Sequence, residues 1–327
     1  MNNNVMAIPL WAQRMDQLAS DGVPFLFILD FDLADPLVIP LKDIDASPGE
    51  IQFQIRKSRI NLDGNTAESR FSKYPVSYEA YNHGFEEVLK AIHAGDTYLL
   101  NLCYSTRMEG LPSLEEIFEA VQAPYKLYVP GRFVVFSPEQ FIAVSKGVIR
   151  TFPMKGTIDA SIPDAEATLL ADIKEQEEHA TVVDLLRNDL SIVSNKVTVN
   201  RYRYITEIKT NDKSLLQCSS EISGIVDGTF SGKPGSIMHA LLPAGSVTGA
   251  PKKRTVELIN EIELEPRGYY TGVFGVFDGK DLDSAVMIRM IEQREDGYYY
   301  RSGGGITYRS VAAQEYQEMI DKVYIPR

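Results

Sequence analysis

Residues 126–152 read KLYVPGRFVVFSPEQFIAVSKGVIRTF and contain three strand-like runs in succession, at 126–129, 132–136 and 141–152. Further strands are predicted at 25–31, 37–41, 51–55, 98–104, 196–200, 214–226, 271–277, 283–293 and 298–302. Because the strands come in consecutive groups rather than alternating strictly with helices, the pattern predicts an α+β fold with large, mostly antiparallel sheets.

Helices are predicted where apolar residues recur at helical spacing. They are expected at 9–19, 77–94, 114–121, 164–192, 236–242, 252–264 and 312–323, and Ser113 with Glu116 forms a capping box before the third of them. The polar segment 57–74, with the turn residues Asp63-Gly64-Asn65, is expected to be a long loop. We therefore expect residues 1–74 to form a short, β-rich segment integrated in the same fold as a main domain of residues 75–327.

Charge and cysteine content restrict the class of protein. The 327 residues are 44% hydrophobic and 24% charged, and the net charge of −12 argues against nucleic-acid binding. Cys103 and Cys218 are expected to be buried thiols in a reducing cytosol rather than a disulfide. The sequence shows no signal peptide and no apolar stretch of the ~20 residues that span a bilayer, so we expect a cytoplasmic protein without a membrane segment.

Lys155 lies between a proline turn and a glycine in the segment Thr151-Phe152-Pro153-Met154-Lys155-Gly156-Thr157. A lysine held on a rigid turn can act as an amine nucleophile or as a cation if its surroundings exclude water and lower its pKa. Most lysines are solvated surface charges, so this residue alone leaves both interpretations open.

Two predicted helices carry carboxylates three residues apart, which places each pair on one helix face. The pairs are Glu175 with Glu178, and Glu315 with Glu318, the latter followed by Lys322. Either pair alone is compatible with a solvated acidic face. Two helices that each present such a pair can hold Mg²⁺, which prefers oxygen ligands and keeps waters that a substrate can replace.

Two glycine-rich segments and one arginine are candidate anion-binding sites. Residues 245–253, GSVTGAPKK, enter a helix whose first amides suit an anion, but the P-loop spacing is absent, which argues against ATP. Gly303 to Gly305 follow a strand and form either a carboxylate-binding backbone or a bulge. Arg289, inside an apolar strand, makes either a structural ion pair or a bidentate contact with a carboxylate ligand.

Taken in order, these segments resemble the chorismate-utilising enzymes, a family that includes anthranilate synthase component I, aminodeoxychorismate synthase component I, isochorismate synthase and salicylate synthase. The matching stretches are 95–98, 137–139, 153–157, 178–179, 184–190, 245–252, 267–272, 289, 303–306 and 315–322. The resemblance covers residues from about Ser77 to the C-terminus and makes 75–327 the chorismate-binding catalytic domain. It implies two large, mostly antiparallel sheets packed on each other, with outer helices and the active site between the sheets.

The resemblance also implies roles for the candidate residues. Mg²⁺ would bridge a carboxylate of chorismate to Glu178 and Glu318, with Glu175 and Glu315 as second ligands or proton-transfer groups. The other substrate carboxylate and the ring would contact the remaining candidates, which are Gly156, Thr157, Ser246, Tyr270, Arg289, Gly303, Gly304, Gly305 and Lys322.

Two positions discriminate within the family. Lys155 stands where anthranilate synthases usually have alanine, and a lysine there resembles aminodeoxychorismate synthase. The implied chemistry is attack of the Lys155 amine on C2 of chorismate as the C4 hydroxyl leaves, after which ammonia enters at C4 and displaces the lysine. Leu99 replaces the water-activating lysine of isochorismate-forming members. The implied product is 4-amino-4-deoxychorismate, for 4-aminobenzoate and folate biosynthesis, with anthranilate synthesis as the alternative.

The sequence departs from the family at some positions and lacks two motifs. Gln217 stands where many members have a histidine, and no tryptophan-binding motif is recognisable in the short N-terminal region. Neither cysteine lies in the nucleophile-elbow context of a glutamine amidotransferase, so a separate glutaminase subunit is expected to supply ammonia. A non-catalytic chorismate-binding module and a nucleotide-dependent enzyme are the rival hypotheses, and the second is weakened by the absent P-loop spacing.

Overall fold

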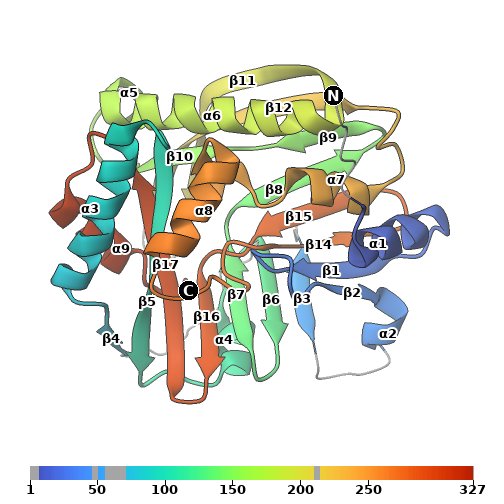
Figure 1. Ribbon diagram of the computed structural model, residues 1–327, viewed down its shortest axis with the longest axis horizontal. Coiled ribbons are helices and arrows are strands. Elements are labelled where there is room, and N and C mark those ends of the chain that lie inside the picture. The colour runs from blue at the N-terminus through green and yellow to red at the C-terminus, as the bar shows by residue number, and fades with distance from the viewer. Residues whose placement is uncertain (1–6, 46–50, 56–70, 210–213, 327) are drawn as a thin grey trace.

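The structure is a computed structural model that describes residues 7–45, 51–55, 71–209 and 214–326. Two antiparallel sheets pack against each other and carry helices on their outer faces (Figure 1). This arrangement confirms the α+β class and the two-sheet architecture. Most of the expected loop 57–74, including its Asp-Gly-Asn turn, lies outside the described residues.

The first sheet has the strand order β10-β12-β9-β8-β15-β14-β1-β2, and β11 pairs additionally with β12. Its strands are β1 (Phe25–Leu29), β2 (Leu37–Pro40), β8 (Gln140–Ser145), β9 (Val148–Thr151), β10 (Met154–Asp159), β11 (Ser194–Lys209), β12 (Ser214–Val226), β14 (Val273–Phe277) and β15 (Leu282–Val286). Each neighbouring pair is antiparallel.

The second sheet has the order β13-β5-β17-β16-β7-β6-β3, and β4 pairs with β5. Its strands are β3 (Gln52–Ile55), β4 (Ser72–Tyr74), β5 (Leu99–Glu109), β6 (Tyr125–Val129), β7 (Phe133–Ser137), β13 (Gly249–Ala250), β16 (Met290–Arg294) and β17 (Gly297–Ile306). Strands from the first 74 residues thus take part in both sheets, β1 and β2 in one and β3 and β4 in the other.

Helices cover the outer face of each sheet (Figure 1). On the first sheet lie α1 (Leu10–Ser20), α5 (Ala165–Ala171), α6 (Ile173–Val193) and α7 (Pro234–Leu241), and on the second α3 (Tyr78–Ala94), α4 (Leu114–Ala120), α8 (Lys252–Ile262) and α9 (Ala312–Asp321). A short helix α2 (Leu41–Asp45) follows β2. Among the described helices, none is both long and apolar enough to cross a membrane.

Strand β1 shows how the layers are held together, because all five of its residues are buried. Phe25, Phe27 and Leu29 belong to the core beneath α1, α6 and α7, whereas Leu26 and Ile28 pack against the second sheet. A strand that is covered on both faces has a continuous apolar run instead of an alternating one. The first sheet therefore separates two hydrophobic cores.

Several predicted elements differ in the structure. The expected strand 141–152 is a hairpin, β8 and β9, which turns at Lys146 and Gly147 with φ of 51° and 75°. The expected helix 164–192 is divided into α5 and α6, because the side chain of Asp172 accepts a hydrogen bond from the Glu175 amide and begins a new helix. Strand β4 and helix α2 were not predicted.

The expected strand 283–293 is also two strands, and they belong to different sheets. The chain leaves β15 in the first sheet and enters β16 in the second through Met287–Arg289, with a φ of 53° at Arg289. A second crossover, from β7 to β8, runs through Pro138 and Glu139. The two crossovers lie side by side, since the Phe136 amide donates to the Arg289 carbonyl (3.0 Å) and the Val286 amide to the Glu139 carbonyl (3.2 Å).

Candidate active site

A cavity of about 420 Å³ lies beside the two crossovers. Every site residue predicted from the sequence except Glu315 lines it, namely Lys155, Gly156, Thr157, Glu175, Glu178, Ser246, Tyr270, Arg289, Gly303, Gly304, Gly305, Glu318 and Lys322. Glu315 lines an adjoining hollow of about 510 Å³, in whose wall Lys155 and Glu178 also lie. The structure thus brings residues from distant parts of the chain to one place.

Lys155 is on a strand rather than on a turn, which corrects the expectation from the sequence. It is the second residue of β10, and the pairing of β10 with β12 shifts register between Met154 and Thr157. This β-bulge includes Gly156, whose φ is 79°. The Lys155 amine lies 3.3 Å from Oε2 of Glu178, and the two side chains are 32% and 24% exposed. The amine is therefore held at the cavity wall by a residue of helix α6.

Gly156 is required at its position for two reasons. Its positive φ disfavours residues with a Cβ, and a Cβ there would lie 2.9 Å from Oε2 of Glu175 and 2.9 Å from Leu169. Glu175 is in the first turn of α6, and Glu178 follows one turn later. The predicted carboxylate pair of this helix does face the cavity.

Helix α9 lies over the glycine run from the other side. The Lys322 amine is 2.7 Å from Oε1 of Glu318 and donates to the Gly303 carbonyl at 2.9 Å. A Cβ at Gly304 would lie 3.5 Å from both Oε2 of Glu315 and the Lys322 amine. Gly303 to Gly305 were expected to follow the strand, but they lie inside β17 and pair with β5. The absence of a side chain at Gly304 leaves room for these charged groups of α9, whereas Gly303 and Gly305 face residues of β5.

Glu139 is a cavity residue for which the sequence suggested no role, although Ser137-Pro138-Glu139 is one of the matching stretches. The Ser246 hydroxyl donates to Oε1 of Glu139 at 3.2 Å. Burial raises the pKa of the Glu139 carboxyl, while the Ser246 hydrogen bond and the charges of Lys155 and Arg289 oppose this shift. A carboxyl with a raised pKa keeps its proton to a higher pH than an exposed one and can donate it to a leaving group.

Arg289 faces the cavity from the crossover between β15 and β16. Its Nη1 donates to the Lys322 carbonyl at 2.8 Å, and its guanidinium lies 4.8 Å from the centre of the Tyr324 ring. Among the described residues, no carboxylate forms an ion pair with it. The sequence left two roles open for Arg289. The described residues contain no ion pair for it, and its contact with a ligand carboxylate stays a prediction.

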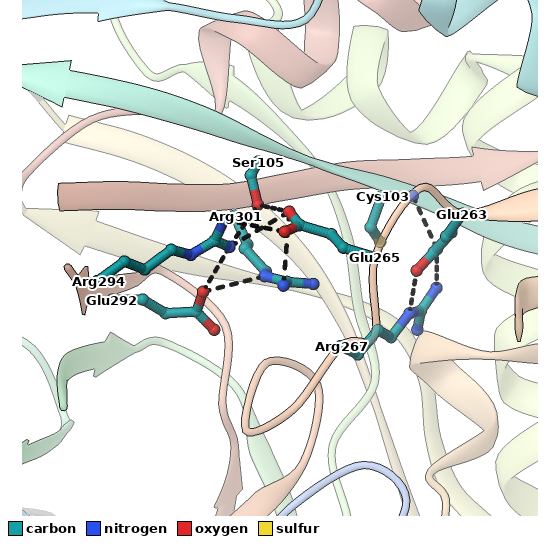
Figure 2. Close-up of polar contacts among 8 residues, drawn as sticks. All are labelled: Cys103, Ser105, Glu263, Glu265, Arg267, Glu292, Arg294 and Arg301. Atoms are coloured by element: carbon teal, nitrogen blue, oxygen red, sulfur yellow. Dashed lines mark hydrogen bonds and ion pairs between the residues drawn. The ribbon is translucent and has the colours of Figure 1, made fainter. Parts of the chain in front are cut away.

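The wall behind the cavity contains a buried ion pair, which Figure 2 shows beside a second charged cluster. Arg267 Nη2 lies 2.6 Å from Oε1 of Glu263, and both side chains are almost fully buried. Arg267 also donates to the carbonyls of Asn101 (2.6 Å) and Val247 (2.8 Å), and the Cys103 amide donates to Glu263 (3.0 Å). Asn101, Cys103 and Val247 all line the cavity, so this pair fixes three parts of its wall.

The second cluster in Figure 2 contains two arginines and two glutamates. Arg301, which lines the cavity, contacts Glu292 at 3.2 Å and Glu265 at 3.5 Å. Arg294 binds the same two carboxylates, each at 2.8 Å. The charge of the buried Arg301 guanidinium is thus neutralised by Glu292 and Glu265.

The donor set is suited to Mg²⁺ shared with a substrate. No group of three or more His, Cys, Asp or Glu side chains that could hold a metal ion occurs in the described ranges. Mg²⁺ is usually held by one or two carboxylates together with substrate oxygens and water. Glu178 and Glu318 both line the cavity, and each pairs with a lysine. Glu178 and Glu318 would be the carboxylates for an ion that is completed by a ligand, and this metal site stays a prediction.

Comparisons with known proteins agree with this geometry. The model of the chorismate binding enzyme family matches residues 44–326. The chain is 46% identical over 324 residues to an uncharacterized PabA-like protein of Pasteurella multocida, covering 98% of this chain and 99% of that protein.

Relatives with named activities are more distant. The chain is 34% identical over 302 residues to anthranilate synthase component 1 of Aeropyrum pernix, covering 86% of this chain and 65% of the relative. It is 31% identical over 262 residues to aminodeoxychorismate synthase component 1 of Salmonella typhimurium, covering 74% and 56%. The crystal structure of anthranilate synthase component I from Streptococcus pneumoniae superposes with a TM-score of 0.67 at 29% identity, covering 78% of this chain and 59% of that one.

Proposed function

The chain belongs to the chorismate-binding enzyme family, and we propose that within it the protein is an aminodeoxychorismate synthase component I. It would convert chorismate and ammonia to 4-amino-4-deoxychorismate, with Lys155 as a covalent nucleophile. The observation that carries this proposal is the position of the Lys155 amine in the cavity wall, 3.3 Å from Glu178 and near Glu139.

The first step needs an amine and an acid that both reach the bound substrate. The neutral Lys155 amine forms a bond to C2 of chorismate, the ring double bonds shift, and the C4 hydroxyl leaves as water with a proton from an acid. The lysine nitrogen loses one proton, which restores the acid. Glu139, whose pKa is raised by burial, is our candidate for the donor of that proton. Glu175 faces the cavity beside Gly156 and is a further candidate for proton transfer, as is Glu315 in the adjoining hollow.

In the second step ammonia forms a bond to C4, the double bonds shift back, and the bond between C2 and the Lys155 nitrogen breaks. The ammonia nitrogen loses one proton, and the lysine regains its amine. The component 1 names of two relatives support a partner subunit, for which we propose a glutaminase that supplies the ammonia.

The charges of the wall explain how a dianion could bind to an acidic protein. Arg301 is already paired with Glu292 and Glu265, and Glu139 would carry the proton that it donates. The remaining carboxylates, Glu175, Glu178 and Glu318, and the remaining cations, Lys155, Arg289 and Lys322, are equal in number. Chorismate adds two carboxylates. Mg²⁺ held by Glu178 and Glu318 would supply the compensating positive charge and polarise a substrate carboxylate. Arg289 and Tyr270 would hold the other carboxylate at the opposite side of the cavity.

Product analysis tests the proposal. The protein is incubated with chorismate, Mg²⁺ and ammonium, and an added lyase converts aminodeoxychorismate to 4-aminobenzoate for chromatography. We expect 4-aminobenzoate only when the lyase is present, and loss of product in Lys155→Ala. Lys253→Ala, at an exposed lysine that does not line the cavity, is the control.

The alternative product is anthranilate, and it is favoured by the identity to the Aeropyrum pernix enzyme over most of this chain. Formation of anthranilate with release of pyruvate, at a rate that Lys155→Ala leaves unchanged, would replace our proposal with that activity. Chorismate binding without turnover would instead indicate a non-catalytic module.

A further inference from the structure

Asp189, near the end of helix α6, is a buried carboxylate outside the cavity wall. Its Oδ1 lies 2.7 Å from the amine of Lys252, at the start of α8, and its Oδ2 accepts a hydrogen bond from the Gly245 amide at 3.1 Å. The Lys252 amine also donates to the Leu241 carbonyl at 2.8 Å. Asp189 therefore ties helix α6 to Gly245, within the segment that joins α7 to α8, and to the first residue of α8.

That segment carries Ser246, and its backbone is held at nearly every residue. The Asn101 amide donates to the Thr248 carbonyl at 2.8 Å, and Arg267 donates to the Val247 carbonyl at 2.8 Å. Asp189 holds the remaining end, at Gly245. These three anchors hold the backbone on both sides of Ser246, whose hydroxyl donates to Glu139.

We propose that Asp189 is a positioning residue, which acts through the Gly245 amide to place the Ser246 hydroxyl on Glu139. The inference rests on the proposed function, in which Glu139 supplies the proton for the leaving hydroxyl. Asp189 does not line the cavity, so in this proposal it acts on the reaction through the Gly245–Ser246 backbone.

The close fit at Gly245 supports a dedicated contact. A Cβ on Gly245 would lie 2.7 Å from Oδ2 of Asp189, so the carboxylate can reach this amide only because the residue is glycine. A buried ion pair is in itself weak evidence for stability, because removal of two charges from water costs much of what their attraction returns. The pair of Asp189 and Lys252 is better explained by the geometry that it imposes.

The sign of the effect on Glu139 separates positioning from simple electrostatics. The charged groups that face Glu139 are Lys155 of β10 and Arg289 of the crossover, and Ser246 is its hydrogen-bond donor. Removing the negative charge of Asp189 would, by electrostatics alone, favour the ionised form of Glu139. Loss of the Ser246 hydrogen bond disfavours that form, because the bond stabilises the carboxylate. Asp189→Asn and Ser246→Ala should therefore move the titration of Glu139 in the same, upward direction.

The test is a carbon-13 NMR titration of the glutamate carboxyls in the full-length, ligand-free protein, with the Glu139 signal assigned by its absence in Glu139→Gln. We expect Asp189→Asn and Ser246→Ala each to shift this titration upward, and the double variant to shift it no further than Ser246→Ala. Asp184→Asn is the matched control, because Asp184 is an exposed residue of the same helix that pairs with Arg187. It should leave the titration unchanged.

The kinetic counterpart is a drop in kcat/KM of roughly 10- to 100-fold for Asp189→Asn, as expected for a displaced catalytic group. A downward or absent shift of the Glu139 titration in folded Asp189→Asn would overturn the proposal, as would additive shifts in the double variant. If Asp189→Asn does not fold, Gly245→Ala displaces the same amide without changing any charge, and the same upward shift is expected. The titration needs no substrate, so its result is independent of whether the protein turns over chorismate.

Discussion

The amine of Lys155 on strand β10 and a carboxylate oxygen of Glu178 on helix α6 lie 3.3 Å apart in the wall of the cavity. Both side chains are partly exposed, and ion pairs of this kind contribute less than about 1 kcal/mol to stability. Their arrangement therefore has little value for the fold. In the proposed function it holds an amine and a carboxylate that would bind Mg²⁺ in the wall of one cavity.

Glu178→Gln should separate the contribution of Glu178 to stability from its contribution to activity. We expect the free energy of unfolding to change by less than about 1 kcal/mol. We expect kcat/KM to fall roughly 100-fold, because the proposed Mg²⁺ would lose a ligand and its charge would no longer stabilise the substrate carboxylate. Glu177→Gln is the control, because Glu177 is next to Glu178 in the sequence but pairs with Arg309 at the surface, 3.0 Å away. Urea unfolding and steady-state kinetics measure the two quantities. Equal activity of the two variants would refute the role of Glu178.

Gly156→Ala tests the bulge beside Lys155. A residue with a Cβ at φ of 79° is strained by about 1–2 kcal/mol, and here the Cβ also meets Glu175. We expect loss of stability and of kcat together. Gly131→Ala provides the comparison, because Gly131 has φ of 68° but nothing within 4 Å of the position that a methyl group would take. It should lose similar stability and keep full kcat; a comparable loss of kcat in both variants would contradict the account.

The pH dependence of stability should report the ionisation of the Glu139 carboxyl. Its pKa in the folded protein is raised by burial above the ordinary value of 4.5, so folding is favoured at low pH and loses free energy as pH rises through the folded pKa. Glu139→Gln lacks this loss. We expect the variant to be inactive but more stable than the native chain at pH 8, with the difference vanishing below pH 4.5, as measured by calorimetry. Parallel stability curves would show that Glu139 is not buried in this way.

His179, next to Glu178, should stay neutral into the acid range. It is 1% exposed, its Nε2 lies 2.7 Å from the Ser220 hydroxyl, and burial with the nearby charges of Arg203 and Lys155 lowers its pKa to about 4. The unfolded chain binds a proton near pH 6.5, so this residue stabilises the fold above that pH and loses its contribution as pH falls toward 4. Proton NMR of the imidazole, assigned with His179→Gln, should show a midpoint near 4; a midpoint near 6.5 would disprove the burial.

Local sequence patterns predict much of this molecule. The helices around Ser77 and Ser113 begin at serine caps, and Glu175 with Glu178 reach the cavity together because helical spacing puts them on one face. The grouping of strands gives the α+β class. These features depend on neighbours within one or two turns, which is the information that a sequence contains directly.

The crossovers between the sheets could not be predicted in this way. The run 283–293 reads as one continuous strand, and only the pairing of its halves with β14 and β7 shows that they belong to different sheets. Arg289 adopts φ of 53° without being glycine, so no residue type marks the break. Glu139 was assigned no role for the same reason: its position in the cavity depends on the second crossover. The bulge at Gly156 likewise depends on its partner strand β12.

In the proposed reaction Lys155 forms a bond to the substrate, and intact-protein mass spectrometry after rapid quenching can detect this bond. With chorismate and Mg²⁺ in the absence of ammonium, we predict an adduct with the mass of chorismate less one water, located on the peptide that contains Lys155. Lys253→Ala should form the same adduct, and Lys155→Ala should not. The proposed role of Lys155 would be wrong if the native protein formed no adduct and Lys155→Ala turned over chorismate with ammonium at the native rate.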